Sequence, residues 1–182
     1  YNQPQKMTVT KRVQPTQQTA SPAPLPDLRA TFEHLHRETP IENYFASRGL
    51  SEGIQNAYLL GSHMDGLDYF LSRYDEFTDQ PDWYTKTYKH FIPVIDPNGE
   101  VHHFLPYAKD SKYKVRNLSD REIRLFNDRY VMDSSLVTGS KYIFVTEGVF
   151  DALSFEEIGR KAIALNSTSN AGKLLELVEK NK

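Results

Sequence analysis

The stretch Tyr142-Ile-Phe-Val-Thr-Glu-Gly-Val-Phe-Asp-Ala-Leu-Ser154 places a carboxylate directly after an apolar run of β-forming residues. Residues 142–145 are uncharged and either β-branched or aromatic, which predicts a strand buried on both faces. Gly148 tolerates backbone angles that other residues resist, so we expect a sharp turn after Glu147. Because ligands of open α/β sheets bind at the carboxyl ends of strands, Glu147 is the first candidate functional residue.

The residues that follow predict a strand–helix–strand–helix unit. An amphipathic helix is expected from about Asp151, with Gly159 as its C-cap. A second short apolar run covers residues 162–165, a polar loop follows, and residues 171–179 carry apolar side chains at helical spacing. Because strands joined by a helix are usually parallel, we predict a βαβα unit with parallel strands at residues 139–182.

The composition is ordinary for a protein that buries a hydrophobic core. The chain has 182 residues, of which 38% are hydrophobic and 25% charged, and it contains no cysteine. This excludes disulfide bonds and zinc sites built from thiolates. No secretory signal and no membrane-length apolar run is present, so we expect a cytoplasmic protein that does not bind a membrane. A chain that starts at Tyr1 rather than Met is expected to be a piece of a longer protein.

Two further regions precede the βαβα unit. Residues 1–27 are rich in Pro, Gln and Thr, which predicts a largely disordered linker. Residues 28–138 are expected to form one subdomain that begins with short helices. β-forming residues recur at 83–88, 90–95 and 101–107, and Asp96-Pro-Asn-Gly99 is a strong turn signal. These patterns predict an antiparallel β-meander, so the N-terminal lobe is expected to be α+β.

The net charge of −2 is unevenly distributed along the chain. Residues 29–83 contain four basic and ten acidic side chains, whereas residues 84–130 contain nine basic and six acidic ones. A basic excess with interleaved aromatic residues suits a nucleic-acid path, and it equally suits a solvated surface. Charge alone does not separate these two interpretations.

The segment Thr146-Glu-Gly-Val-Phe-Asp-Ala-Leu-Ser154 resembles the first motif of the Toprim domain, the metal-dependent catalytic fold of bacterial primases, topoisomerases and some nucleases. The motif is most similar to that of primases from phages, plasmids and other mobile elements, including primase–helicase fusions. Tyr44-Phe-Ala-Ser-Arg-Gly-Leu-Ser51 and the middle segment also resemble the polymerase core of DnaG-type DNA primases. This resemblance covers about residues 40 to 180 and implies an α+β lobe followed by an incomplete α/β Toprim domain.

The resemblance also implies an activity for the longer protein. Such primases synthesise RNA primers on a single-stranded DNA template from nucleoside triphosphates, with Mg²⁺ or Mn²⁺, and a replicative helicase, fused or separate, is a candidate partner. The motif glutamate acts there as general base or metal ligand, the role that falls to Glu147 in this sequence. Basic residues ahead of the Toprim unit lie along the template path, and by position the candidates are Lys112, Lys114 and Arg116.

Four more residues belong to the same candidate site. Gly148 follows the glutamate, and Asp151 lies one helical turn further on, where it either reaches the site or caps the helix. Asn166 and Asn170 follow the second predicted strand, so they line the same strand-end crevice or form an ordinary polar loop. We take all four as candidate substrate-binding or cofactor-binding residues.

The sequence departs from the Toprim pattern in one respect that affects the chemistry. Toprim enzymes carry an Asp-x-Asp pair at the end of a later strand, and no aspartate follows Lys161. The remaining metal ligands are therefore absent, and we expect this chain alone to be inactive. Two alternatives stay open: a Toprim nuclease or topoisomerase, and a non-catalytic module that binds DNA or docks a partner.

Overall fold

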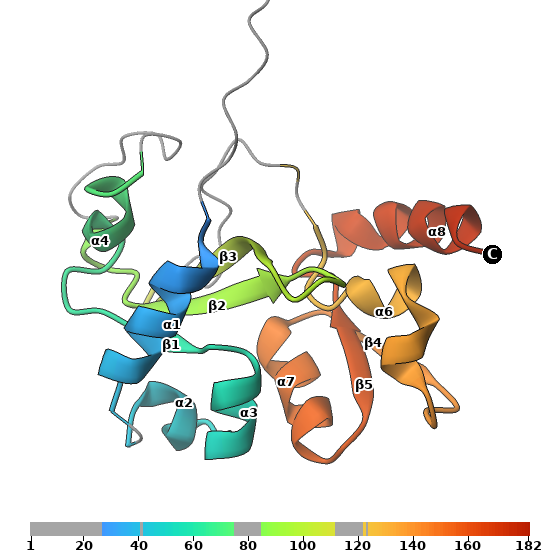
Figure 1. Cartoon of the computed structure of the whole chain (residues 1–182), viewed down its shortest axis with the longest axis horizontal. Helices are drawn as coiled ribbons and strands as arrows, with labels where there is room; N and C mark the ends of the chain where they lie inside the picture. The colour runs from blue at the N-terminus through green and yellow to red at the C-terminus, as the bar shows by residue number, and fades with distance from the viewer. Residues whose placement is uncertain (1–26, 41, 75–84, 112–121, 123) are drawn as a thin grey trace, which may run out of the picture.

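An antiparallel three-stranded sheet forms the centre of the N-terminal lobe (Figure 1). Its strands are β1 (Gly61–Ser62), β2 (His90–Ile95) and β3 (Val101–Tyr107), in the order β1-β2-β3. The structure is a computed structural model that describes residues 27–40, 42–74, 85–111, 122 and 124–182. The predicted linker therefore lies almost entirely outside the described residues.

The turn between β2 and β3 forms as its sequence predicts. The Asp96 carboxylate accepts hydrogen bonds from the backbone N–H groups of Asn98 at 2.8 Å and Glu100 at 2.9 Å. Gly99 has a φ of +87°, which glycine adopts without steric cost. These hydrogen bonds and the Gly99 conformation form the turn of the β2–β3 hairpin, in which Ile92 pairs with Leu105.

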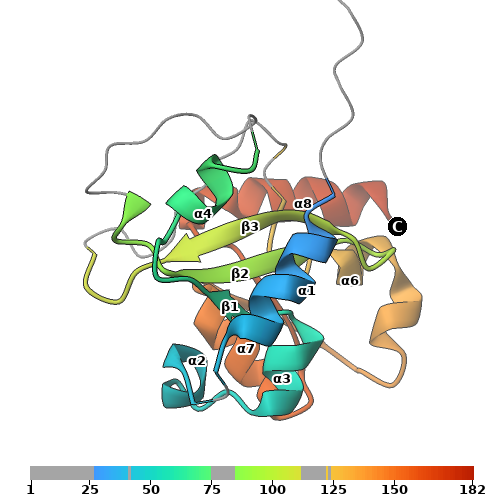
Figure 2. The same cartoon turned by 60° about the vertical axis from the view of Figure 1, so that its left-hand side comes forward.

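Both faces of this hairpin are buried, because successive side chains of a strand point to opposite faces. On one face, Phe91 and Phe104 pack with Phe32 of helix α1 (Arg29–Glu38) and with Phe70 of helix α4 (Asp68–Leu71). Figure 2 shows α1 lying across this face. On the other face, Ile92 and Leu105 pack with the helices α2 (Tyr44–Ser47), α3 (Glu52–Ala57) and α7 (Val149–Glu157).

The first strand of the meander is not where the sequence predicts it. Residues 85–88 form a helical residue and a turn rather than a strand, and β1 takes the place next to β2. Thr85 and Tyr88 are buried, and the backbone N–H of Leu67 donates to the Thr85 carbonyl at 2.9 Å. An aromatic-rich run of this length is compatible with either conformation, and packing under the β1–α4 loop selects the turn.

The predicted βαβα unit is confirmed. Strand β4 (Ile143–Thr146) pairs in parallel with β5 (Lys161–Ala164), with Phe144 opposite Ala162. Helix α7 joins the two strands, and helix α8 (Ala171–Lys180) follows the loop after β5. The C-cap residue of α7 is Ile158, and the predicted C-cap Gly159 follows it directly with a φ of +71°.

Strand β4, however, is not buried on both faces. Tyr142, Phe144 and Val145 are 64%, 37% and 53% exposed. Within the described part of the chain β4 pairs only with β5, so it is an edge strand. The apolar pattern identified the strand correctly. How far β4 is buried depends on the elements that pack against it, which a local pattern does not encode.

A continuous hydrophobic core joins the two halves of the chain. Val149, Ala152 and Leu153 of α7 contact the antiparallel sheet on one side and Ala162 and Ala164 of β5 on the other. Helix α6 (Arg129–Met132), the 3₁₀ turn η1 (Ser134–Val137) and α8 cover the opposite face of the parallel pair. The predicted domain boundary between residues 138 and 139 stays a prediction. Among the described helices, none is long and apolar enough to cross a membrane.

Candidate functional site

Glu147 lies at the carboxyl end of β4, at the same edge where β5 ends. The backbone N–H of Leu165 donates to the Thr146 carbonyl at 3.0 Å, and the N–H of Asn166 donates to the Glu147 carbonyl at 2.8 Å. These two hydrogen bonds extend the parallel ladder beyond the strands, so Glu147 and Asn166 are neighbours. The Glu147 side chain is exposed and therefore accessible to a ligand.

The turn after Glu147 does not require the conformational freedom of glycine. Gly148 has φ −105° and ψ 148°, an extended conformation open to any residue, so the expected glycine-specific turn is wrong. Gly148 is instead the N-cap residue of α7, where a Cβ atom would lie 3.2 Å from Oδ2 of Asp151. Asp151 is in the first helical turn, where the helix dipole favours a carboxylate. Among the described residues, no side-chain hydrogen bond caps this helix.

Asn166 combines an unusual backbone conformation with an unsatisfied polar atom. Its φ of +57° lies in the left-handed region, which asparagine tolerates better than most residues. Its Oδ1 atom is buried and has no hydrogen-bond partner among the described residues. An unpaired buried oxygen costs about 1–3 kcal/mol, so it is a natural acceptor for a bound donor or cation.

Asn170 has a more local role in the structure. It lies in the short turn η2 (Thr168–Asn170), and its side-chain amide donates to the Leu165 carbonyl at 2.8 Å. This bond closes the loop that carries Asn166. A role for Asn170 in ligand binding stays a prediction.

The oxygen donors at this edge are of the kind that Mg²⁺ and Mn²⁺ bind. They are the carboxylates of Glu147 and Asp151 and the amide oxygen of Asn166. Mg²⁺ usually takes one or two carboxylates and keeps several water ligands. Within the part of the chain that the structure describes, no group of three or more His, Asp or Glu side chains could hold a metal. The residues present therefore fit a metal held by Glu147 together with water and substrate, not a closed protein cage.

A row of aromatic rings connects this edge with the antiparallel sheet. Phe150 in the first turn of α7 packs edge-on against Tyr107 of β3, with ring centroids 4.7 Å apart. Tyr44 of α2 stacks on Tyr107 at 5.5 Å and on His90 of β2 at 4.2 Å. The exposed guanidinium of Arg48 lies 4.8 Å from the Phe150 ring centroid. The row thus places a cation beside the helix that begins directly after Glu147.

His90 and Tyr44 of this row stay uncharged near neutral pH. Burial, with the charge of Lys89 as a second cause, lowers the pKa of His90 to about 4. Burial also raises the pKa of Tyr44 to about 12, and a hydrogen bond with Tyr107 acts in the same direction. Arg48 therefore supplies the charge next to an otherwise neutral aromatic surface.

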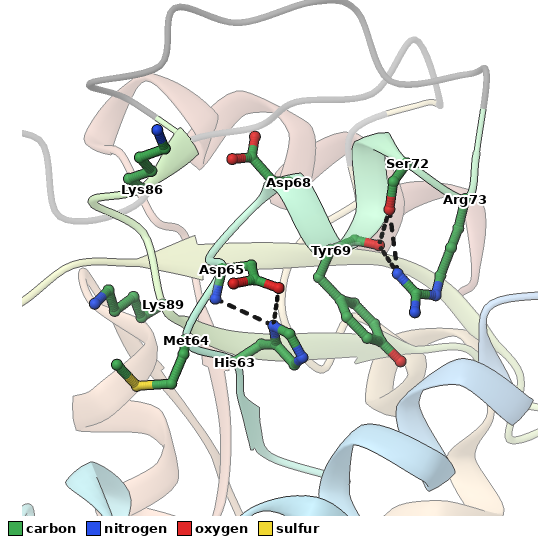
Figure 3. A pocket seen from close by; sticks show the side chains of 9 residues that line it. All are labelled: His63, Met64, Asp65, Asp68, Tyr69, Ser72, Arg73, Lys86 and Lys89. Carbon is green, nitrogen blue, oxygen red and sulfur yellow. Dashed lines mark hydrogen bonds and ion pairs between the residues drawn. The ribbon is translucent and has the colours of Figure 1, made fainter.

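A cavity of about 600 Å³ opens beside Lys89, the residue that precedes His90 (Figure 3). Lys86 and Lys89 lie on one side of it and Arg73 on the other, with the carboxylates of Asp65 and Asp68 between them. We refer to it as the basic cavity; its lining is His63, Met64, Asp65, Asp68, Tyr69, Ser72, Arg73, Lys86 and Lys89.

Planar groups lie against one another along one wall of the basic cavity. The His63 and Tyr69 rings lie 4.3 Å apart, and the Arg73 guanidinium lies 3.9 Å from the Tyr69 ring centroid. The backbone N–H of His63 donates to the Lys89 carbonyl at 2.9 Å, which ties this wall to the start of β2. The cavity offers cations and flat surfaces, the two features with which proteins bind single-stranded nucleic acids.

Sequence reasoning missed most of this second region. Arg48 lies inside the primase-like stretch 44–51, but its position next to Phe150 depends on a contact between residues about a hundred positions apart. Lys89 and His63 come together only through the pairing of β1 with β2. The predicted template-path residues Lys112, Lys114 and Arg116 lie outside the described residues.

No protein-family model and no curated protein matches this sequence. Solved structures, in contrast, match its fold. A DNA primase domain from Pseudomonas aeruginosa is similar with a TM-score of 0.62 at 18% identity, over 85% of this chain and 57% of that one. The E. coli primase catalytic core matches with a TM-score of 0.61 at 17% identity, over the same two shares, 85% and 57%.

A DnaG primase catalytic domain solved bound to single-stranded DNA is also similar. Its TM-score is 0.56 at 18% identity, over 84% of this chain and 61% of that one. The chain therefore has the fold of the DnaG catalytic core, an α+β lobe followed by parallel strands. It spans less than two thirds of the length of the structures it matches.

Proposed function

We propose that the longer protein containing this chain is a DNA primase, which synthesises RNA primers on single-stranded DNA by metal-dependent nucleotidyl transfer. The observation that carries the proposal is Glu147, exposed at the end of β4 and bonded through its carbonyl to Asn166, within the DnaG-core fold. This is the edge of the sheet at which α/β folds bind their ligands.

In this reaction the 3′-hydroxyl of the growing primer attacks the α-phosphorus of a nucleoside triphosphate, and pyrophosphate leaves. Mg²⁺ or Mn²⁺, when bound, neutralises the phosphate charge. Glu147 would hold this ion or accept the hydroxyl proton, since its carboxylate is the one that ends a strand of the parallel sheet. Asn166 would accept a hydrogen bond from the substrate through Oδ1, because this oxygen has no partner among the described residues.

The template would follow the aromatic row and the basic cavity. Arg48, Lys89 and Arg73 would contact phosphates, and the flat surfaces between them suit unstacked bases. Lys112, Lys114 and Arg116 remain candidates for the same path. The single-stranded DNA in one of the similar DnaG structures supports this part of the proposal.

The second set of metal ligands would come from another strand of the longer protein. An Asp-x-Asp strand could pair with the free edge of β4, where Tyr142, Phe144 and Val145 are exposed. The residues of the Glu147 motif support a primase of a phage, plasmid or other mobile element. Such a protein would act in the cytoplasm with a fused or separate replicative helicase.

The test is primer synthesis by a protein that continues through the next strand, on single-stranded DNA with Mg²⁺ and labelled nucleotides. Glu147→Gln should reduce primer synthesis by at least about 10²-fold, because a catalytic carboxylate is removed. Its stability should change by less than about 0.5 kcal/mol, because the side chain is exposed. Glu179→Gln on the exposed surface of α8 is the matched control and should be fully active.

Three other outcomes would contradict the proposal. Full activity of the Glu147→Gln variant would remove Glu147 from the active site. DNA cleavage by the wild type without primer synthesis would favour a Toprim nuclease. DNA binding without either reaction would favour a non-catalytic module.

A further inference from the structure

The segment just before α6 forms the second edge of strand β5. Phe126 makes an antiparallel bridge with Ala164, and the N–H of Ala164 donates to the Phe126 carbonyl at 3.1 Å. Strand β5 is thus held between β4 on one side and Phe126 on the other. The strand that ends beside Glu147 is therefore positioned by two different parts of the chain.

Asn127 makes the polar contacts of this second edge. It is only 2% exposed, and its φ of +62° lies in the left-handed region. Its side-chain amide donates to the Ala162 carbonyl of β5 at 3.0 Å and to the Tyr58 hydroxyl at 3.1 Å. A strained conformation persists only where its surroundings hold it, and here two buried acceptors do so.

Tyr58 provides the link to the N-terminal lobe. It is the residue at which α3 ends, and its ring packs against Phe126 with centroids 5.4 Å apart. Its hydroxyl also lies 3.1 Å from the hydroxyl of Tyr130. Burial raises the pKa of Tyr58 strongly, so the phenol stays neutral and its hydroxyl acts through hydrogen bonds. Shortly after Tyr58 the chain enters β1 and then the basic cavity.

Asn127 therefore lies between the two regions of the proposed active site. On one side is the lobe that carries the basic cavity, and on the other is β5, which leads directly to Asn166 and its bond to Glu147. We propose that Asn127 is a positioning residue, which holds the Glu147–Asn166 edge in register with the DNA-binding lobe. The effect of Asn127 on catalysis rests on the proposed function. Its structural role, holding β5 against the N-terminal lobe, does not depend on that function.

Amide hydrogen exchange of the 182-residue chain tests this role. Asn127→Gly keeps the left-handed backbone accessible and removes the side chain with both of its hydrogen bonds. It should accelerate exchange of the Ala164 and Asn166 amides by about tenfold relative to amides of β2, because loss of the two hydrogen bonds loosens the end of β5 that carries both residues. Tyr58→Phe removes one acceptor and should show the same selective pattern, more weakly; it decides the matter if Asn127→Gly does not fold.

Asn43→Gly is the matched control. The Asn43 side chain also donates two hydrogen bonds, to the Pro40 carbonyl and the Gln55 side chain, and accepts two from the backbone N–H groups of Phe45 and Ala46, all within the N-terminal lobe. This variant should leave the Asn166 amide unchanged. Equal acceleration in both lobes, or no acceleration at Asn166, would overturn the proposal.

In the longer protein, Asn127→Gly should lower kcat for nucleotide addition several-fold and leave the affinity for single-stranded DNA unchanged. An unchanged kcat would overturn the positioning role in catalysis. If the wild type makes no primers, the proposed function fails, and the exchange experiment still decides whether Asn127 holds the edge.

Discussion

Phe150→Ala is the substitution that tests most directly whether the two halves of the chain share one core. Phe150 lies in the first turn of α7 and is 9% exposed. Its ring contacts Tyr107 of β3, Phe45 of α2 and the guanidinium of Arg48, all of which belong to the N-terminal lobe. Removing the ring therefore opens a cavity between the two lobes.

The expected cost follows from this burial. Truncation of a buried phenylalanine to alanine costs about 3–5 kcal/mol, and the slight exposure of Phe150 places it at the lower end, about 3 kcal/mol. For a chain of this size, a loss of about 1 kcal/mol lowers Tm by about 2–4 °C. Phe150→Ala should therefore lower Tm by about 6–12 °C.

Urea unfolding followed by circular dichroism measures this cost, with Phe155→Ala as control. Phe155 lies on the same helix, but it is only half-buried and stacks on the exposed Phe144, so its removal should cost about 1–2 kcal/mol. A cost for Phe150→Ala no larger than for Phe155→Ala would refute the reasoning. Two separate unfolding transitions, of which only one shifts, would show that the lobes do not share a core.

Two further predictions concern His90 in the aromatic row and Lys89 in the basic cavity. The folded protein binds a proton at His90 only near pH 4, whereas the unfolded chain does so near pH 6.5. The free energy of unfolding should therefore fall as pH drops from about 6.5 to 4, and His90→Gln should make this fall smaller. An NMR titration that places the His90 pKa near 6.5 would contradict it. Lys89→Ala should weaken single-stranded DNA binding and reduce the slope of log K against log salt by about 0.7, while Lys180→Ala on α8 should not. An unchanged slope for Lys89→Ala would remove the basic cavity from the DNA path.

Several features of this protein depend only on residues close together in the sequence. The Asp96–Gly99 turn and the order of strands and helices after residue 142 formed as predicted, and Gly159 ends the α7 region one residue after the C-cap. Their signals act through local hydrogen bonds, backbone angles and periodicity, which a short stretch of chain determines by itself. The position of Glu147 at a strand end follows from the same local pattern.

Tertiary structure decided how these pieces meet. The exposure of β4, the choice of residues 61–62 over 85–88 as a strand, and the approach of Arg48 to Phe150 depend on partners far away in the sequence. The left-handed conformations of Asn127 and Asn166 are likewise held by contacts with distant strands. Pairing and burial are properties of the packed chain, because the free energy of a contact depends on which surfaces exclude water together. The sequence therefore identified the carboxylate, and packing determined what surrounds it.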